Sequence, residues 1–87
     1  MGARRQSRAK KPERGLYVRR VLARNVKRLR DHRGMNQEEL ADAANLHQSE
    51  ISDIENAKSN IRLDIVQSLA TGLSARLAEL FEEAKRG

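Results

Sequence analysis

Residues 36–56 read NQEELADAANLHQSEISDIEN, and this segment predicts two short helices joined by a tight turn. Asn36 can cap the first helix, and Glu39 lies three residues later, where its side chain can reach back to the cap. Asn45 interrupts the pattern, since asparagine is the residue other than glycine that best adopts a left-handed turn conformation. The second helix is expected from about Gln48 to Asn56.

The apolar residues of this segment suit two helices that cross steeply. Helices joined by a turn of roughly three or four residues must approach each other closely, which requires a small residue at their contact. Ala41 supplies it, Leu46 fills the turn from below, and Ile51 and Ile54 fill the angle between the helices. This joint placement is more specific than a simple apolar stripe, and it predicts a helix-turn-helix over about residues 37–56.

The segment before residue 36 predicts a longer helix. Apolar residues recur at steps of three and four from Val18 to Leu29 and form one stripe. Gly34 follows this stripe and can adopt the left-handed conformation that commonly ends a helix.

The segment after residue 56 predicts a loop and two more helices. Asn60 is expected to cap a helix whose apolar residues lie between Leu63 and Ala70, and residues 72–74 are expected to break it. A last short helix then carries Leu77, Leu80 and Phe81. Because alternating runs of β-branched residues are few, the sequence predicts an all-α fold of five helices rather than a sheet.

Length and composition are those of one small domain. The 87 residues have room for one modest core, with residues 1–15 expected to form a flexible basic arm and residues 16–87 the folded domain. The chain has no cysteine, which excludes a disulfide framework and a thiolate metal site. No apolar run is long enough to cross a bilayer, so we expect a cytoplasmic protein without a membrane partner.

Charge is distributed unevenly along the chain. Residues 1–30 carry a net charge of +11 and residues 31–87 a net charge of −5. A basic arm on a mildly acidic body suggests a polyanion as partner. The alternative is a solvated tail that serves only solubility.

No set of residues indicates an enzyme. The sequence lacks a glycine-rich phosphate loop, and His32 and His47 have no partners at metal-ligand spacing. Ser49 and Ser52 lack the His and Asp partners that nucleophilic catalysis requires. We therefore expect no catalytic site, no cofactor and no metal.

Two stretches, MNQEELA at residues 35–41 and LHQSEISDIE at residues 46–55, resemble the Cro/phage-repressor helix-turn-helix family, also called XRE-like. The resemblance covers about Val21 to Phe81. The segment NIRL at residues 60–63 is most similar to the restriction–modification controller proteins within that family. The resemblance implies a phage-repressor-like domain that binds double-stranded DNA and regulates transcription, and that is associated with the nucleoid when it is bound to DNA.

The resemblance implies a role for each matching position. Gln37 corresponds to a residue that contacts phosphate, and the helix from about residue 48 to 56 is the recognition helix. Its side chains expected in the major groove are Gln48, Ser49, Ser52 and Asp53. Those expected along the DNA backbone are Asn56, Lys58 and Asn60. Without the surrounding pattern, Gln48 and Ser49 would be read as ordinary polar surface residues.

Two further features bear on the DNA-binding interpretation. Arg30 and Glu55 match a family pair that forms an interhelical salt bridge, the alternative being two solvated charges. Ala57 replaces the usual glycine, so the loop after the recognition helix is expected to be strained or rerouted. The basic arm offers Arg4, Arg5 and Arg8, which either enter a narrow minor groove and follow phosphates or do nothing specific.

The apolar residues near the C-terminus exceed what so small a domain can enclose, which predicts a homodimer. The expected interface residues are Ile65, Leu77, Ala78 and Phe81, although Phe81 could instead close the monomer core. The resulting hypothesis is a homodimeric regulator on an operator with two-fold symmetry. The alternatives are an antitoxin-type protein-interaction module that also binds DNA, and a sequence-indifferent nucleic-acid binder.

Overall fold

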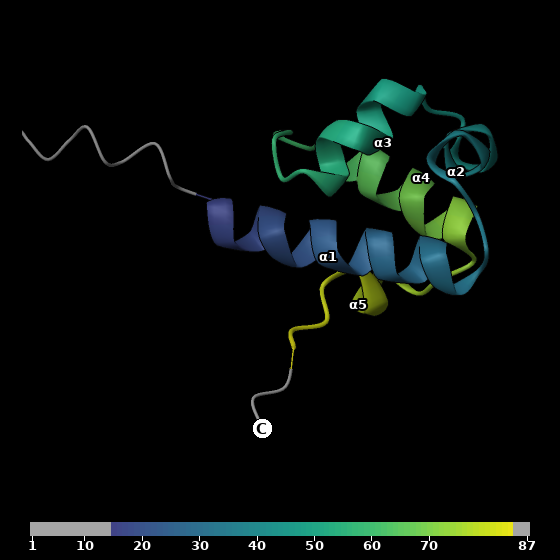
Figure 1. Ribbon diagram of the computed structural model, residues 1–87. Coiled ribbons are helices and arrows are strands. Elements are labelled where there is room, and N and C mark those ends of the chain that lie inside the picture. Colours follow the sequence, from purple (N-terminus) through teal and green to yellow (C-terminus); the bar gives the residue numbers. More distant parts are fainter. Residues whose placement is uncertain (1–14, 85–87) are drawn as a thin grey trace, which may run out of the picture.

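Five helices follow one another in the computed structural model, which describes residues 15–84 (Figure 1). They are α1 (Leu16–His32), α2 (Gln37–Ala44), α3 (Gln48–Glu55), α4 (Leu63–Leu73) and α5 (Leu77–Leu80). No strand occurs in this part of the chain, so the expected all-α fold of five helices is confirmed. The arm expected over residues 1–15 lies, apart from Gly15, outside the described residues.

The ends of α1 and α2 follow the local chemistry of the sequence. Asn36 and Glu39 form a reciprocal capping box, in which each backbone N–H donates to the other's side chain at 2.8 Å. Gly34 and Asn45 take left-handed conformations after α1 and α2, with φ of 67° and 58°. Both conformations agree with the sequence-based expectation.

The core lies where α1 to α4 meet. Helix α1 packs against α3 on one side and against the short α5 on the other, while α2 packs against α3 and α4 (Figure 1). The fully buried large side chains include Val26, Leu40, Ile51, Leu69, Leu73 and Leu80. Helices α2 and α3 thus pack closely against each other, and α1 and α4 hold them in place.

One expectation about the apolar pattern is wrong, and the expected break after α4 lies at Ser74 rather than at Gly72. Val18 lies on the predicted stripe of α1 but is 48 % exposed, because the N-terminal end of α1 extends beyond the core. The break expected at residues 72–74 does not occur at Gly72, since α4 continues to Leu73 and ends at Ser74, whose φ is 53°. Gly72 serves packing instead, because a Cβ there would lie 3.0 Å from the backbone nitrogen of Ala44 in α2.

A buried asparagine that the sequence did not reveal attaches the C-terminal segment to α1. Asn25 is fully buried, and its Nδ2 donates to the carbonyl oxygens of Leu80 at 2.9 Å and Glu82 at 2.8 Å. Arg24 also donates to the Glu82 carbonyl at 2.7 Å, and the Tyr17 hydroxyl donates to the Glu83 carboxylate. Within residues 15–84, no helix has both the length and the apolar character that crossing a membrane demands.

Candidate nucleic-acid interface

Helix α3 presents one polar face to solvent and one apolar face to the core. Ile51 and Ile54 are buried, so they fix the orientation of the helix. Its polar face consists of Gln48, Ser49 and Asp53, which are exposed, and Ser52, which is half-buried. Residues at these spacings lie on one side of a helix, so the four residues expected to contact bases form one continuous surface.

The negative charge of Glu50 is partly compensated within α3 itself. Its carboxylate accepts a hydrogen bond from the backbone N–H of His47 at 2.8 Å, at the N-terminus of its own helix. A carboxylate there satisfies an otherwise unpaired donor and complements the helix dipole. Asp53 remains exposed on the polar face of α3.

A polar network joins α1, α2 and α3 behind that face. The structure contains the ion pair expected between Arg30 and Glu55, with Nε–Oε2 at 2.7 Å and Nη2–Oε1 at 3.0 Å. Both side chains are largely buried, at 11 % and 5 % exposure. The same guanidinium donates to the carbonyl of Met35 at 2.8 Å, and its pKa is held above the ordinary value chiefly by the hydrogen bonds to Glu55.

Gln37 also belongs to this network. Its Nε2 donates to Oε1 of Glu55 at 3.1 Å, and the residue is half-buried at the first position of α2. The N-terminus of α2 is thereby tied to the C-terminus of α3. The helix whose N-terminal N–H groups suit a phosphate is thus held in a fixed position relative to the polar face of α3.

The loop after α3 carries the residues expected along the DNA backbone. Asn56 and Lys58 are exposed, and the Asn56 amide donates to the Ser52 carbonyl at 2.8 Å. Ala57 has a φ of 58°, so the loop keeps the left-handed conformation that glycine would adopt more easily. This agrees with the expected strain at that position.

Asn60 does not cap α4, which corrects the sequence-based expectation. Its Oδ1 accepts from Nη1 of Arg19 at 3.1 Å, and the N-cap position of α4 is occupied by Arg62, without a side-chain cap. An exposed ion pair between Arg62 and Asp64 lies there instead, and its hydrogen bonds lower the pKa of the Asp64 carboxyl.

Arg19 is a residue of this region that the sequence did not single out. Besides Asn60, it contacts the carbonyl oxygen of Ala57 through Nε at 3.3 Å. These contacts place the start of α1 beside the loop that follows α3 (Figure 1). Arg4, Arg5 and Arg8 precede this point and lie outside the described residues. The only local signal was that Arg19 lies off the apolar stripe of α1.

The residues expected at a dimer interface are not equally available. Leu77 is 54 % and Phe81 39 % exposed, and Ala78 is exposed beside them. Ile65 is half-buried and packs against the core, so it has less surface to offer a partner. Leu63, which was counted among the apolar residues of this helix but not among the interface residues, is 84 % exposed at the start of α4.

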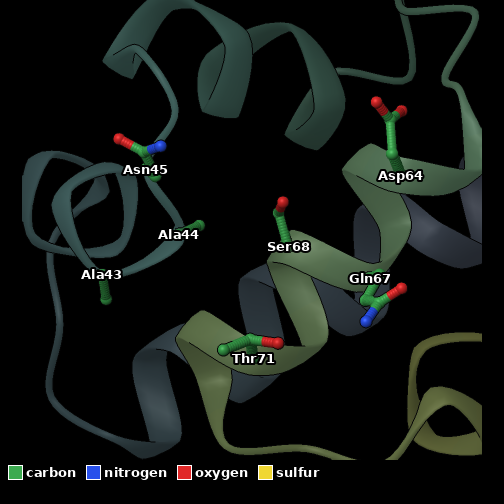
Figure 2. Close-up of a pocket in the computed structure, with 7 residues that line it drawn as sticks. All are labelled: Ala43, Ala44, Asn45, Asp64, Gln67, Ser68 and Thr71. Atoms are coloured by element: carbon green, nitrogen blue, oxygen red, sulfur yellow. The ribbon is translucent and has the colours of Figure 1, made fainter.

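A shallow hollow of about 380 Å³ lies between the end of α2 and the outer face of α4 (Figure 2). Ser68 projects from α4 into it, and Asn45 lies at its rim. Its lining residues are Ala43, Ala44, Asn45, Asp64, Gln67, Ser68 and Thr71. They include a carboxylate but no cation, so the hollow has nothing that favours a phosphate.

Comparison with known proteins agrees with this architecture. The helix-turn-helix family HTH_3 matches residues 26–80, which is more than half of the chain. The matched range includes all of α2, α3, α4 and α5. No curated protein sequence matches the chain.

Several solved structures share the fold. A hypothetical transcription factor, NHTF, from Neisseria is 32 % identical with a TM-score of 0.72, over 75 % of each chain. The restriction-modification controller protein C.AhdI from Aeromonas hydrophila is 30 % identical with a TM-score of 0.70, over 72 % of this chain and 96 % of that one. The wild-type controller protein C.Esp1396I is 26 % identical with a TM-score of 0.70, over 75 % and 87 %.

Proposed function

The chain belongs to the HTH_3 helix-turn-helix family, and on this basis we propose that it is a sequence-specific DNA-binding regulator of transcription without enzymatic activity. The observation that carries the proposal is the polar face of α3. The buried residues Ile51 and Ile54 fix α3 on the core, while the four polar side chains remain together on its other side. An α-helix presented in this way fits the major groove of B-DNA.

In this proposal the side chains of α3 read base edges. Gln48 can bond adenine at N6 and N7, and Asp53 can accept from the amino group of cytosine. Ser49 and Ser52 can bond either donors or acceptors. Because Asp53 repels phosphates while suiting one base edge, we infer that α3 contributes more to specificity than to general affinity.

Contacts to the DNA backbone supply the remaining affinity. We assign them to the N-terminus of α2 with Gln37, to the loop after α3 and to the basic arm. The loop residues are Asn56, Lys58 and Asn60, and the arm residues are Arg4, Arg5 and Arg8. The start of α1 lies beside the loop after α3, which supports an arm that runs along the DNA next to the recognition helix.

We also propose that two copies act together on an operator with two-fold symmetry. The exposed apolar residues of α5 lie on the side of α1 away from α3 (Figure 1). A contact between copies through α5 therefore leaves both recognition helices free. Such dimers place their recognition helices roughly one turn of DNA apart, about 34–36 Å.

Selection of bound sequences from a random duplex pool tests the proposal directly. We expect a site with two related halves, and Gln48→Ala should weaken binding to it by about 1–3 kcal/mol while relaxing the preference at one position of each half. Gln67→Ala, on the outer face of α4, is the matched control and should bind as the wild type does. If Gln48→Ala weakened binding equally on every sequence, α3 would not be reading bases.

A further inference from the structure

One side chain of α1 fastens the loop that follows α3 at two points. Arg19 donates from Nε to the carbonyl oxygen of Ala57 at 3.3 Å and from Nη1 to Oδ1 of Asn60 at 3.1 Å. The two acceptors are three residues apart in the loop. A single planar guanidinium therefore sets the distance between the start of the loop and its middle.

The loop needs such a fastening because its own backbone is unfavourable. Ala57 is left-handed, with hydrogen bonds from its N–H to Ile54 and from Lys58 N–H to Asp53 closing the turn. Beyond Lys58 the loop reaches the core again at Ile61, which packs against it. Between these two points the Asn60 side chain is held by Arg19.

We propose that Arg19 is a positioning residue that holds this loop in the conformation in which Lys58 and Asn60 meet the DNA backbone. The inference rests on the proposed function, because those two residues are assigned to phosphates there. A loop that is already ordered loses less conformational freedom on binding than one that must be ordered by the DNA. Arg19 acts through the loop and not through a base.

Two other roles for Arg19 make different predictions. If only its charge mattered, lysine would replace it fully, since both residues are cations. If it only stabilised the fold, its loss would lower the thermal midpoint without changing the affinity of the folded protein. A lysine has one nitrogen and cannot reproduce the directed Nε and Nη1 bonds, so Arg19→Lys separates positioning from charge.

The test compares the full chain with Arg19→Lys and Asn60→Ala variants on the selected operator. We expect Arg19→Lys to lose about five- to ten-fold in affinity, as one loop becomes free to move before binding. The log–log salt slope should stay the same, because the number of cations is unchanged. Arg20→Lys, at the exposed neighbouring position of α1, is the matched control and should bind like the wild type.

Amide hydrogen exchange without DNA gives a second readout. Arg19→Lys should speed exchange in residues 57–61 while leaving the core of α3 protected. Adding Asn60→Ala to Arg19→Lys should cost less than the two separate losses, since the anchor is already gone. If Arg19→Lys binds with wild-type affinity, the inference about Arg19 is wrong but the proposed function stands. If the wild-type chain binds no DNA, the proposed function is wrong as well.

Discussion

Each of the helices α1 to α4 is followed, one or two residues after its last residue, by a residue in the left-handed conformation, and only one of the four is glycine. The φ angles are 67° at Gly34, 58° at Asn45, 58° at Ala57 and 53° at Ser74. In each case the N–H of the following residue donates to the carbonyl five positions earlier, at 2.8 to 3.0 Å. A side chain in this conformation costs roughly 1–2 kcal/mol, so the end of α3 stores strain of about that size at Ala57.

The carboxylate of Glu55 connects α1, α2 and α3 at a single point. Glu55 accepts from Arg30 of α1 and from Gln37 of α2, while lying at the end of α3. A largely buried carboxylate needs such partners because an unpaired buried charge is costly. The network therefore fixes the N-terminus of α2 relative to the C-terminus of α3.

The losses of Arg30 and Glu55 should not be additive, because the two side chains interact. We expect Glu55→Ala to lower the free energy of unfolding by about 3 kcal/mol, because it leaves the largely buried Arg30 guanidinium with only the Met35 carbonyl and the exposed Asp31 carboxylate, 3.3 Å away, as partners. The double variant Arg30→Met with Glu55→Leu should cost clearly less than the two single costs added. Urea denaturation of the four proteins measures this coupling.

The exposed pair Arg62–Asp64 provides the control for that measurement. Its side chains are 74 % and 69 % exposed, so solvent screens the interaction. The corresponding double-mutant cycle should show no measurable coupling. Additive costs at Arg30 and Glu55 as well would contradict the structural role assigned to the buried pair.

At the scale of the helices, small residues set how closely α2 and α4 approach. Gly72 faces Ala44, and a Cβ at Gly72 would lie 3.0 Å from both the nitrogen and the Cβ of Ala44. Glycine in a helix interior ordinarily costs about 1 kcal/mol relative to alanine. That cost is offset here because α2 can then lie directly on α4.

Gly72→Ala should therefore destabilise the protein although it improves helix propensity. We expect a loss of about 1–3 kcal/mol in the free energy of unfolding, since α2 and α4 must separate or distort to make room. Thr71→Ala, on the exposed side of the same turn, should leave stability nearly unchanged. If the Gly72→Ala protein is as stable as the wild type in urea denaturation, then α2 and α4 can move apart without a measurable cost.

These elements also show how far the sequence could predict the structure. Periodicity and caps are local signals, so α1, α2, α3 and their boundaries near Gly34, Asn36 and Asn45 could be predicted. Gly72 is expected to be part of a helix end because glycine often follows a helix, as Gly34 does after α1. At position 72 glycine instead allows close contact with Ala44. Alanine and serine do not themselves favour the left-handed conformation, so Ala57 stands out only because the family usually has glycine there, and Ser74 only as part of the expected break.

The prediction of the candidate site had a different basis. The residues of α3 followed from a resemblance that covers one continuous segment. Arg19 and Asn25 escaped because their partners are 38 to 57 residues away in the chain, and a single sequence contains no signal for such distant pairs. Asn25 reads as a polar residue on an amphipathic helix, although it is fully buried.

At the scale of the whole molecule, the positive charge is concentrated in the N-terminal third of the sequence. Residues 1–30 hold a net charge of +11 against −5 for the remainder. Removing residues 1–14 should weaken binding to every DNA sequence and reduce the slope of log affinity against log salt, because fewer counterions are released. Titrations at several salt concentrations measure both effects. An unchanged slope would mean that the arm does not contact phosphates.

The exposed apolar residues of α5, together with Phe81 directly after it, bear on whether two copies of the molecule associate. Phe81 is 39 % exposed and lies outside the core cluster, with Leu77 and Ala78 beside it in sequence. The Asn25 bonds to the Leu80 and Glu82 carbonyls attach the backbone on either side of Phe81 to α1. Aromatic side chains are enriched among the residues that dominate interface energetics.

We expect the chain to sediment as a dimer at micromolar concentrations, and Phe81→Ala to weaken the dimer by about 2 kcal/mol, or roughly thirty-fold in dissociation constant. Val18→Ala removes an exposed apolar side chain of α1 and should leave the dimer intact. The two subunits of a dimer bind the two halves of an operator together, so a weaker dimer loses this advantage. Phe81→Ala should therefore reduce affinity for the full operator more than for a half-site. A wild-type chain that remains monomeric at every concentration, with and without DNA, would exclude the dimer and leave the α5 surface for another partner.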